Sequence, residues 1–182
     1  TLLLTETVAG TSNLVINVGS GTTVTFANMT ASTFTSGSDT ITINGASGNE
    51  NITGPNLATT IDGGDGADTL VGGNGDDVYL FDSNDVDSGE TITDSGGTAD
   101  VVGIVTSTDF VNLPNASLDD IEQIRFAGAN QTGTFTGAQL TGETLLLTET
   151  VAGTSNLVIN VGSGTTVTFA NMTASTFTSG SD

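Results

Sequence analysis

The residues best suited to chemistry in this sequence are carboxylates, and they are concentrated in one stretch. Residues 60–100 carry 11 of the 21 acidic residues. The chain has no histidine, cysteine or lysine, and its single basic residue is Arg125. Because catalysis by carboxylates, serine or threonine needs a partner base that is missing here, we expect no enzyme. The clustered acids are Asp62, Asp65, Asp68, Asp76, Asp77, Asp82, Asp85, Asp87, Glu90, Asp94 and Asp100.

The charge of the whole chain limits its partners. The formal net charge is −20. Such a chain repels phosphate groups, which excludes nucleic acid as a partner and gives no attraction to an anionic membrane surface. No apolar run approaches the roughly 18 residues of a membrane-spanning helix, so we expect no membrane insertion. Without cysteine, stability cannot come from disulfides.

Glycines accompany the acids at a fixed spacing. Residues 63–71 read GGDGADTLV and residues 72–80 read GGNGDDVYL, and both match the nine-residue pattern G-G-x-G-x-D-x-U-x, where U is apolar. The two preceding blocks of nine keep only part of this pattern. The apolar eighth position persists in all four blocks, as Ile52, Ile61, Leu70 and Tyr79. We therefore interpret the period as structural.

Each block predicts one short strand and one tight glycine-rich turn. Two blocks make one coil, which places Ile52 and Leu70 on one parallel sheet and Ile61 and Tyr79 on a second sheet facing it. The predicted fold class is therefore all-β, a parallel β-solenoid. Its interior is thin and contributes little burial, so the turns need another source of cohesion.

Asp68 and Asp77 occupy the sixth position of their turns and are expected on opposite edges of the stack, next to their counterparts one coil away. Bringing carboxylates together without a cation costs roughly 1–4 kcal/mol per close pair. Calcium accepts six or more oxygen ligands in irregular geometry, whereas magnesium requires a stricter octahedron and zinc prefers histidine or cysteine. The residues therefore predict several calcium ions.

The segment GGDGADTLVGGNGDDVYLFD, at 63–82, resembles the hemolysin-type calcium-binding nonapeptides of the repeats-in-toxin (RTX) family. The resemblance implies a right-handed parallel β-roll with calcium between coils, held by turn carbonyls and the sixth-position aspartate. It implies one ion held by Gly64, Gly66 and Asp68 with the region Asp82–Asp87, and another held by Gly73, Gly75 and Asp77 with the region Glu90–Asp94.

The same resemblance implies two further sets of ligands. Gly63, Asp65 and Asp68 would face back toward Ala46, Gly48 and Glu50, where a glutamate replaces the aspartate of the pattern. Gly72, Asn74 and Asp77 would face Pro55, Leu57 and Thr59, which lack a carboxylate. After Tyr79 the nine-residue register is lost, and we interpret five acids as ligands of irregular closing turns: Asp82, Asp85, Asp87, Asp94 and Asp100.

A much longer repeat organises the chain. Residues 1–39 recur without change at 144–182, an offset of 143 residues, which predicts one repeat unit followed by the start of the next. We divide the unit into a Thr/Val-rich strand region at 1–44, the calcium-binding β-roll at 45–100 and a second strand region at 101–143. The favoured layout is one continuous solenoid. The alternative is a β-roll that alternates with a compact β-sandwich.

These features predict a calcium-dependent structural repeat of a secreted cell-surface protein, such as an adhesin stalk, a surface layer or an extracellular filament. The resemblance implies a Gram-negative source and type I secretion. We expect tandem units or neighbouring chains to self-associate. Two alternatives remain: an ice- or glycan-binding module, against which the uneven spacing of the threonines argues, and a non-catalytic repeat region of a secreted hydrolase or toxin.

Overall fold

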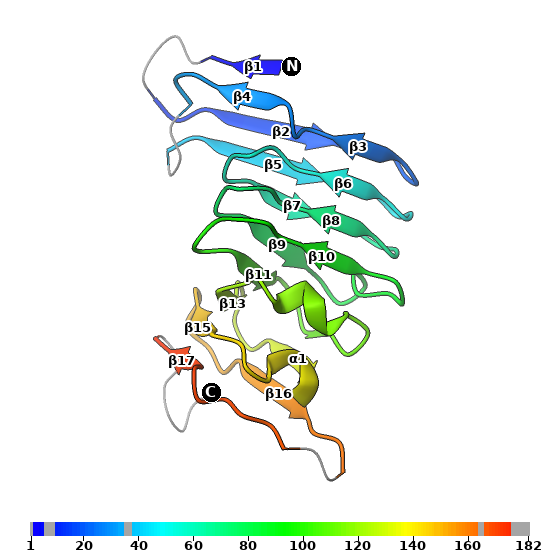
Figure 1. Ribbon diagram of the computed structural model, residues 1–182, viewed down its shortest axis with the longest axis vertical. Helices are drawn as coiled ribbons and strands as arrows, with labels where there is room; N and C mark the ends of the chain where they lie inside the picture. Colours follow the sequence, from blue (N-terminus) through cyan, green and yellow to red (C-terminus); the bar gives the residue numbers. More distant parts are fainter. Residues whose placement is uncertain (1, 6–9, 35–37, 164–165, 176–182) are drawn as a thin grey trace.

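The chain is wound into a stack of coils along one long axis. The computed structural model describes residues 2–5, 10–34, 38–163 and 166–175. The strands run across the axis and lie one above another, and the N-terminus lies at one end of the stack (Figure 1). Because each strand pairs with the strand one coil earlier and one coil later, all sheets are parallel.

Two sheets form the main faces of the stack. The first has eight strands: β2 (Asn13–Asn17), β5 (Thr40–Asn44), β7 (Thr60–Asp62), β9 (Val78–Phe81), β11 (Val101–Ile104), β13 (Gln123–Phe126), β15 (Leu146–Glu149) and β17 (Thr173–Ala174). The second has four: β3 (Thr23–Thr25), β6 (Asn51–Thr53), β8 (Thr69–Val71) and β10 (Thr91–Thr93). A separate pair joins β1 (Leu2–Leu4) to β4 (Met29–Ala31).

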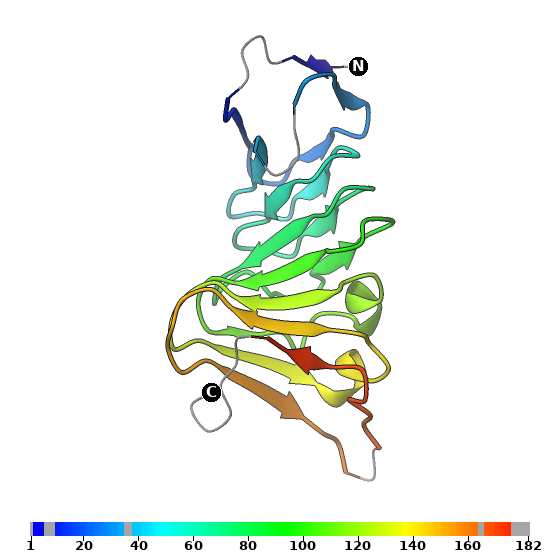
Figure 2. The same cartoon turned by 90° about the vertical axis from the view of Figure 1, so that its left-hand side faces the viewer.

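Beyond β10 the coil widens from two faces to three (Figure 2). The new face is a three-stranded sheet of β12 (Thr108–Asp109), β14 (Thr132–Thr136) and β16 (Asn156–Asn160). The four-stranded sheet is continued by a 3-10 helix, η1 (Asn115–Leu118), and then by α1 (Gly137–Leu140). The junction is direct, because the Ile92 amide of β10 donates to the Ser117 hydroxyl at 3.0 Å. No helix in the described ranges has the length and apolar character needed to cross a bilayer.

The interior consists of rows of side chains that run along the axis. One row of the eight-stranded sheet is Ile43, Ile61, Tyr79, Val102 and Ile124, all fully buried. The facing row on the four-stranded sheet contains Ile52, Leu70 and Ile92. Each such side chain contributes about 1.5–3 kcal/mol by burial. In-register stacking therefore compensates in part for the small width of the two-sided section.

The three-sided section is filled by larger side chains. Phe110 stacks on Phe135 with ring centroids 4.5 Å apart, and it forms a T-shaped pair with Phe81 with ring centroids 5.4 Å apart. The Gln139 amide, buried in α1, donates to the carbonyls of Phe110 and Leu113. This section thus has a wide aromatic core and a neutral internal hydrogen-bond donor.

The all-β parallel solenoid predicted from the sequence is confirmed, as are the two sheets that carry Ile52 with Leu70 and Ile61 with Tyr79. The favoured continuous layout is also correct for the described residues, since the eight-stranded sheet runs from β2 to β17. After β12 the chain leaves the strand conformation at residues 110–113. These residues form a turn, closed by a hydrogen bond from the Leu113 amide to the Phe110 carbonyl, because the chain must bend there toward η1.

Candidate metal centre

The candidate site lies along the two edges of the two-sided section, where glycine-rich turns stack. The turn at 63–68 lies on the turn at 45–50, and the turn at 72–77 lies on the turn at 54–59. The approach is so close that a Cβ atom on Gly66 would overlap the Gly48 carbonyl oxygen, and Gly66 has a φ of 127°. Only glycine combines this backbone angle with this proximity. The turns therefore bring backbone carbonyls and carboxylates together.

One residue of each turn, the residue directly before the next strand, turns its side chain along the axis. On the edge that leads into the eight-stranded sheet, the Thr59 amide donates to Asp77 Oδ1 at 2.8 Å, and the Asp77 amide donates to Asp100 Oδ1 at 2.6 Å. The Asp100 amide in turn donates to Glu122 Oε2 at 2.8 Å. We call Thr59, Asp77, Asp100 and Glu122 the Asp77 row. Each carboxylate in it accepts the amide of the preceding coil.

The opposite edge, which leads into the four-stranded sheet, obeys the same rule. The Glu50 amide donates to Asp68 Oδ1 at 2.7 Å, and the Asp68 amide donates to Glu90 Oε2 at 2.7 Å. We call Glu50, Asp68 and Glu90 the Asp68 row. Both rows place acidic groups in the interior, since Asp77 and Asp68 are fully buried and Glu90 is 1 % exposed.

These hydrogen bonds leave three buried carboxylate oxygens without a partner among the described residues. They are Asp68 Oδ2, Asp77 Oδ2 and Glu90 Oε1. A buried oxygen with no donor costs about 1–3 kcal/mol, and more when it is charged. Glu50 differs, because its two oxygens accept the Gly21 amide at 2.5 Å and the Ala46 amide at 3.0 Å. Asp68, Asp77 and Glu90 therefore each present one free oxygen, whereas Glu50 is satisfied by backbone donors.

The pKa values of the acids in the two rows also indicate that positive charge is missing around them. Burial raises the pKa of Asp77 and of Glu90 to about 8, and the pKa of Asp68 to about 7. Neighbouring carboxylates raise these pKa values further, while the backbone donor to each group opposes the rise. The pKa of Asp100 is raised in the same way to about 6. A cation beside these groups would reverse this penalty.

The Asp77 cluster, formed by Asp77, Asp94 and Asp100, is the more enclosed of two acidic groups. All three residues are buried, and one oxygen from each lies within 4.8 Å of the others. The hydroxyl of Tyr79 donates to Asp94 Oδ2 at 2.7 Å. Gly72 borders the cluster, because a Cβ atom there would overlap Asp77 Oδ2. The Tyr79 hydroxyl thus links the apolar core to this acidic cluster.

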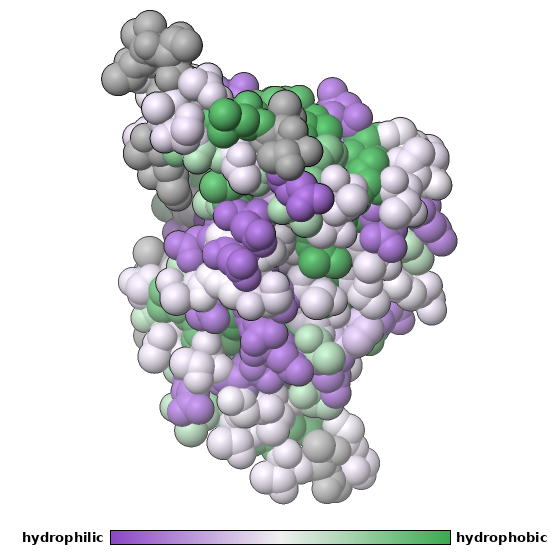
Figure 3. Space-filling view, turned by 45° about the horizontal axis from the view of Figure 1, so that its top comes forward, coloured by the Kyte–Doolittle hydropathy of each residue, from purple (hydrophilic) through white to green (hydrophobic). Residues whose placement is uncertain are grey.

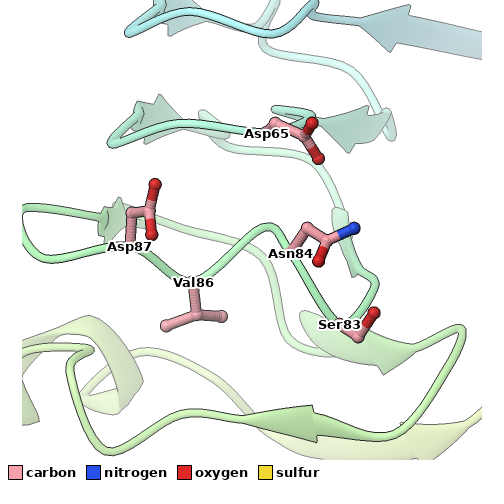
Figure 4. Close-up of a pocket in the computed structure, with 5 residues that line it drawn as sticks. All are labelled: Asp65, Ser83, Asn84, Val86 and Asp87. Carbon is pink, nitrogen blue, oxygen red and sulfur yellow. The ribbon is translucent and has the colours of Figure 1, made fainter.

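The Asp85 cluster, formed by Asp65, Asp82 and Asp85, lies on the other edge and is more open. Burial raises the pKa of Asp85 to about 7, with Asp82 and Asp62 adding to the shift. Asp65 of this cluster also borders a shallow hollow. Across it, Asp65 faces Asn84 and Asp87 of the next coil, while Val86 points away (Figure 4). Both clusters could hold a metal ion.

The structure brings together most of the predicted ligands. Gly64 and Gly66 lie against Ala46 and Gly48, and Gly73 and Gly75 lie against Pro55 and Leu57, as the stacking of the turns requires. Gly63 borders the carboxylate of Asp68, and Asn74 lies against Gly96 of the next coil. The placement of Glu90 beside the Asp77 turn is wrong. Glu90 joins the Asp68 row, because it directly precedes β10, just as Asp68 directly precedes β8 in the same sheet.

Sequence reasoning missed the continuation of the Asp77 row to Glu122 and the role of the Tyr79 hydroxyl. The signal for Glu122 was its position directly before a strand, which it shares with Asp77 and Asp100. No local signal marks Tyr79, since it was interpreted as a core residue and its hydroxyl reaches Asp94 only through the fold. Comparison with family models, curated proteins and solved structures finds no match for this chain.

Proposed function

We propose that this chain is a calcium-dependent structural repeat, in which calcium between the stacked turns stiffens a secreted surface protein. The observation that carries the proposal is the set of unpartnered oxygens of Asp68, Asp77 and Glu90, which are buried beside further carboxylates. A fold that had to stand without a cation would leave these groups costly in either protonation state at neutral pH.

The chemistry of the donors supports calcium over other metals. Every candidate side chain offers oxygen only, and the sequence has no histidine or cysteine for zinc. Asp77, Asp94 and Asp100 would hold one ion, and Asp68 with Glu90 or the Asp85 cluster would hold others. Calcium would supply the positive charge that the rows lack, and it tolerates such irregular oxygen sets. The resemblance of 63–82 to RTX nonapeptides supports the same choice.

The proposed location rests on the same physics. With a net charge of −20, the chain is held apart by self-repulsion wherever calcium is scarce. Extracellular modules of this kind bind calcium at about 10⁻⁴–10⁻³ M, so folding would occur after export to a calcium-rich exterior. We propose an adhesin stalk, surface layer or filament as its setting, exported by type I secretion, with no catalytic role.

Calcium titration tests the proposal at a defined place, because Tyr79 is the only tyrosine and the chain has no tryptophan. Its emission therefore reports on the Asp77 cluster, while circular dichroism reports on the whole fold. Both signals should change together between about 0.1 and 1 mM calcium, and magnesium should act only at higher concentration. Asp77→Asn should raise the calcium concentration at the midpoint at least tenfold, whereas Asp120→Asn, at an exposed site, should leave it unchanged. A chain fully folded in excess chelator at neutral pH would refute the proposal.

A second candidate, binding of ice or glycan, gains one observation. Although the threonines are unevenly spaced along the sequence, the register of the four-stranded sheet aligns them in two outward rows. These rows are Thr23, Asn51, Thr69 and Thr91, and Thr25, Thr53, Val71 and Thr93. Thermal hysteresis of the calcium-loaded protein, lost in Thr53→Tyr, would favour this function.

A further inference from the structure

The duplicated segment is present twice in this structure, in two different settings. In the first copy, Leu3 and Leu4 of β1 pair with Thr30 and Ala31 of β4. In the second copy, the equivalent residues of β15 and β17 pair in the same register, Leu146 with Thr173 and Leu147 with Ala174. The segment therefore folds back on itself in the same way in both places.

Its neighbours, however, lie on opposite sides. The strand NLVIN of the first copy, β2, pairs with β5, which comes after it in the chain. The same strand of the second copy, β16, pairs with β14, which precedes it. In a parallel sheet the preceding and following neighbours occupy the two different edges of a strand. One strand NLVIN can therefore make both pairings at once.

The exposure of the two copies is complementary in the same sense. Val18 is 7 % exposed where β5 covers it, whereas its duplicate Val161 is 52 % exposed. Ser155 is fully buried against Gln131, whereas its duplicate Ser12 is only half-buried. The N-terminal end of the stack accordingly presents apolar surface, including Leu3 at 57 % exposure (Figure 3). The first copy is therefore covered by the strand that follows it, and the second copy is covered by the strand that precedes it.

The four-stranded sheet shows the same difference between the two copies. Residues 23–25 form β3 because β6 pairs with them, whereas the identical residues 166–168 are not a strand. Instead Val167 packs on Gly137 of α1. The duplicated serine also has one partner on each side. In the second copy the Ser155 hydroxyl accepts the backbone amide of Gln131, which precedes it, and in the first copy the backbone amide of Ser12 donates to Asp39 Oδ1, which follows it.

From these contacts we propose that successive units join by a change of face. The three-stranded sheet of one unit becomes the start of the eight-stranded sheet of the next, while the old eight-stranded sheet ends at β17. The two ladders share the strand NLVIN and so merge into one sheet of ten strands. The four-stranded sheet of the next unit starts on α1. The inference rests on the tandem arrangement of the proposed function, and its partner surface is the next copy of the unit.

The join predicts the geometry of an array. From β2 to its duplicate β16 the chain passes the coils that begin at β5, β7, β9, β11, β13 and β15. At about 4.8 Å per coil, each additional unit should lengthen the particle by about 29 Å. Independent globular units on linkers would add length by a different amount and with variable orientation.

Disulfide trapping tests the join in a chain of two consecutive units and a final copy of the duplicated segment. One cysteine pair, Thr134→Cys with Val158→Cys, links the first unit to the segment that opens the second. The other pair, Asn17→Cys with Asn44→Cys within the second unit, links that same segment to the equivalent of β5 in its own unit. Neighbouring parallel strands bring Cα atoms within the disulfide range, and no native cysteine competes.

We expect both disulfides to form in the same molecule, detected by mass after proteolysis. Molecules that form either bond but never both would overturn the join. Each pair alone in the present chain serves as the control, because this structure contains both pairings in separate copies. Running the Asn17→Cys with Asn44→Cys control with calcium and with chelator separates the two proposals. Equal cross-linking in both conditions would contradict the calcium dependence and leave the join untouched.

Discussion

Tyr79 joins the apolar interior to the acidic edge, because its ring lies in the buried row and its hydroxyl donates to Asp94. Removing the hydroxyl with Tyr79→Phe keeps the ring and should lower the free energy of unfolding in saturating calcium by about 1–2 kcal/mol. Chemical denaturation measures this effect. The partner variant Asp94→Asn keeps an acceptor for the phenol but loses the charge. If the double variant were simply additive, Tyr79 and Asp94 would not be coupled as the structure indicates.

The raised pKa values of the buried acids give the pH dependence of the calcium-free chain a definite sign. The Asp77 pKa is about 8 in the fold against an ordinary value of 3.8, so the folded chain binds more protons than the unfolded chain. The stability that this group contributes is therefore fully present below about pH 4 and is lost as pH rises through about 8. Thermal melts in chelator from pH 4 to pH 9 should show a falling midpoint, and saturating calcium should remove most of that slope. A midpoint that rises with pH in chelator would contradict this.

At the scale of the turn, the close stacking of backbone predicts a specific cost for a side chain. Gly66→Ala meets both a φ of 127° and the Gly48 carbonyl, whereas Gly142→Ala meets a φ of 93° with open space around it. Backbone strain alone costs about 1–3 kcal/mol, so both variants should be less stable. Gly66→Ala should lose more stability than Gly142→Ala, and it should need more calcium to reach its folding midpoint, because its turn can no longer pack against the turn of the preceding coil. Equal losses in the two variants would mean that stacking does not matter.

The sequence predicted the elements where the period was regular and failed where the loops changed length. The nine-residue blocks placed β6 to β9 and the pairing of Ile52 with Leu70 correctly. After Tyr79 the coils lengthen, so spacing no longer indicates which edge a carboxylate occupies, and Glu90 was placed on the wrong edge. The third face could not be predicted either. It depends on Phe81, Phe110 and Phe135 meeting in space, and these residues share no local pattern.

Over the whole molecule, the two sections solve the same problem with different groups. In the two-sided section, three buried carboxylate oxygens have no donor among the described residues, and the interior is narrow. In the three-sided section, Gln131 and Gln139 donate their amides to the carbonyls of Val105, Phe110 and Leu113, and aromatic rings fill the core. Neutral side-chain amides thus donate to buried oxygens in the three-sided section, whereas a cation would take this part in the two-sided section. The two sections should therefore differ in their need for calcium.

Removing calcium should accordingly unfold one section before the other. We expect hydrogen exchange in chelator to become fast over residues 45–100 and to stay slow over 101–160, where the wide core requires no ion. Gln139→Ala should remove this difference, because it leaves the carbonyls of Phe110 and Leu113 without their donor and should make residues 101–160 exchange quickly as well. The matched variant Gln123→Ala, at a half-buried site on β13, should leave the pattern unchanged. Loss of protection along the whole chain at a single calcium concentration would instead mean that the coils unfold as one cooperative unit and that the aromatic section has no stability of its own.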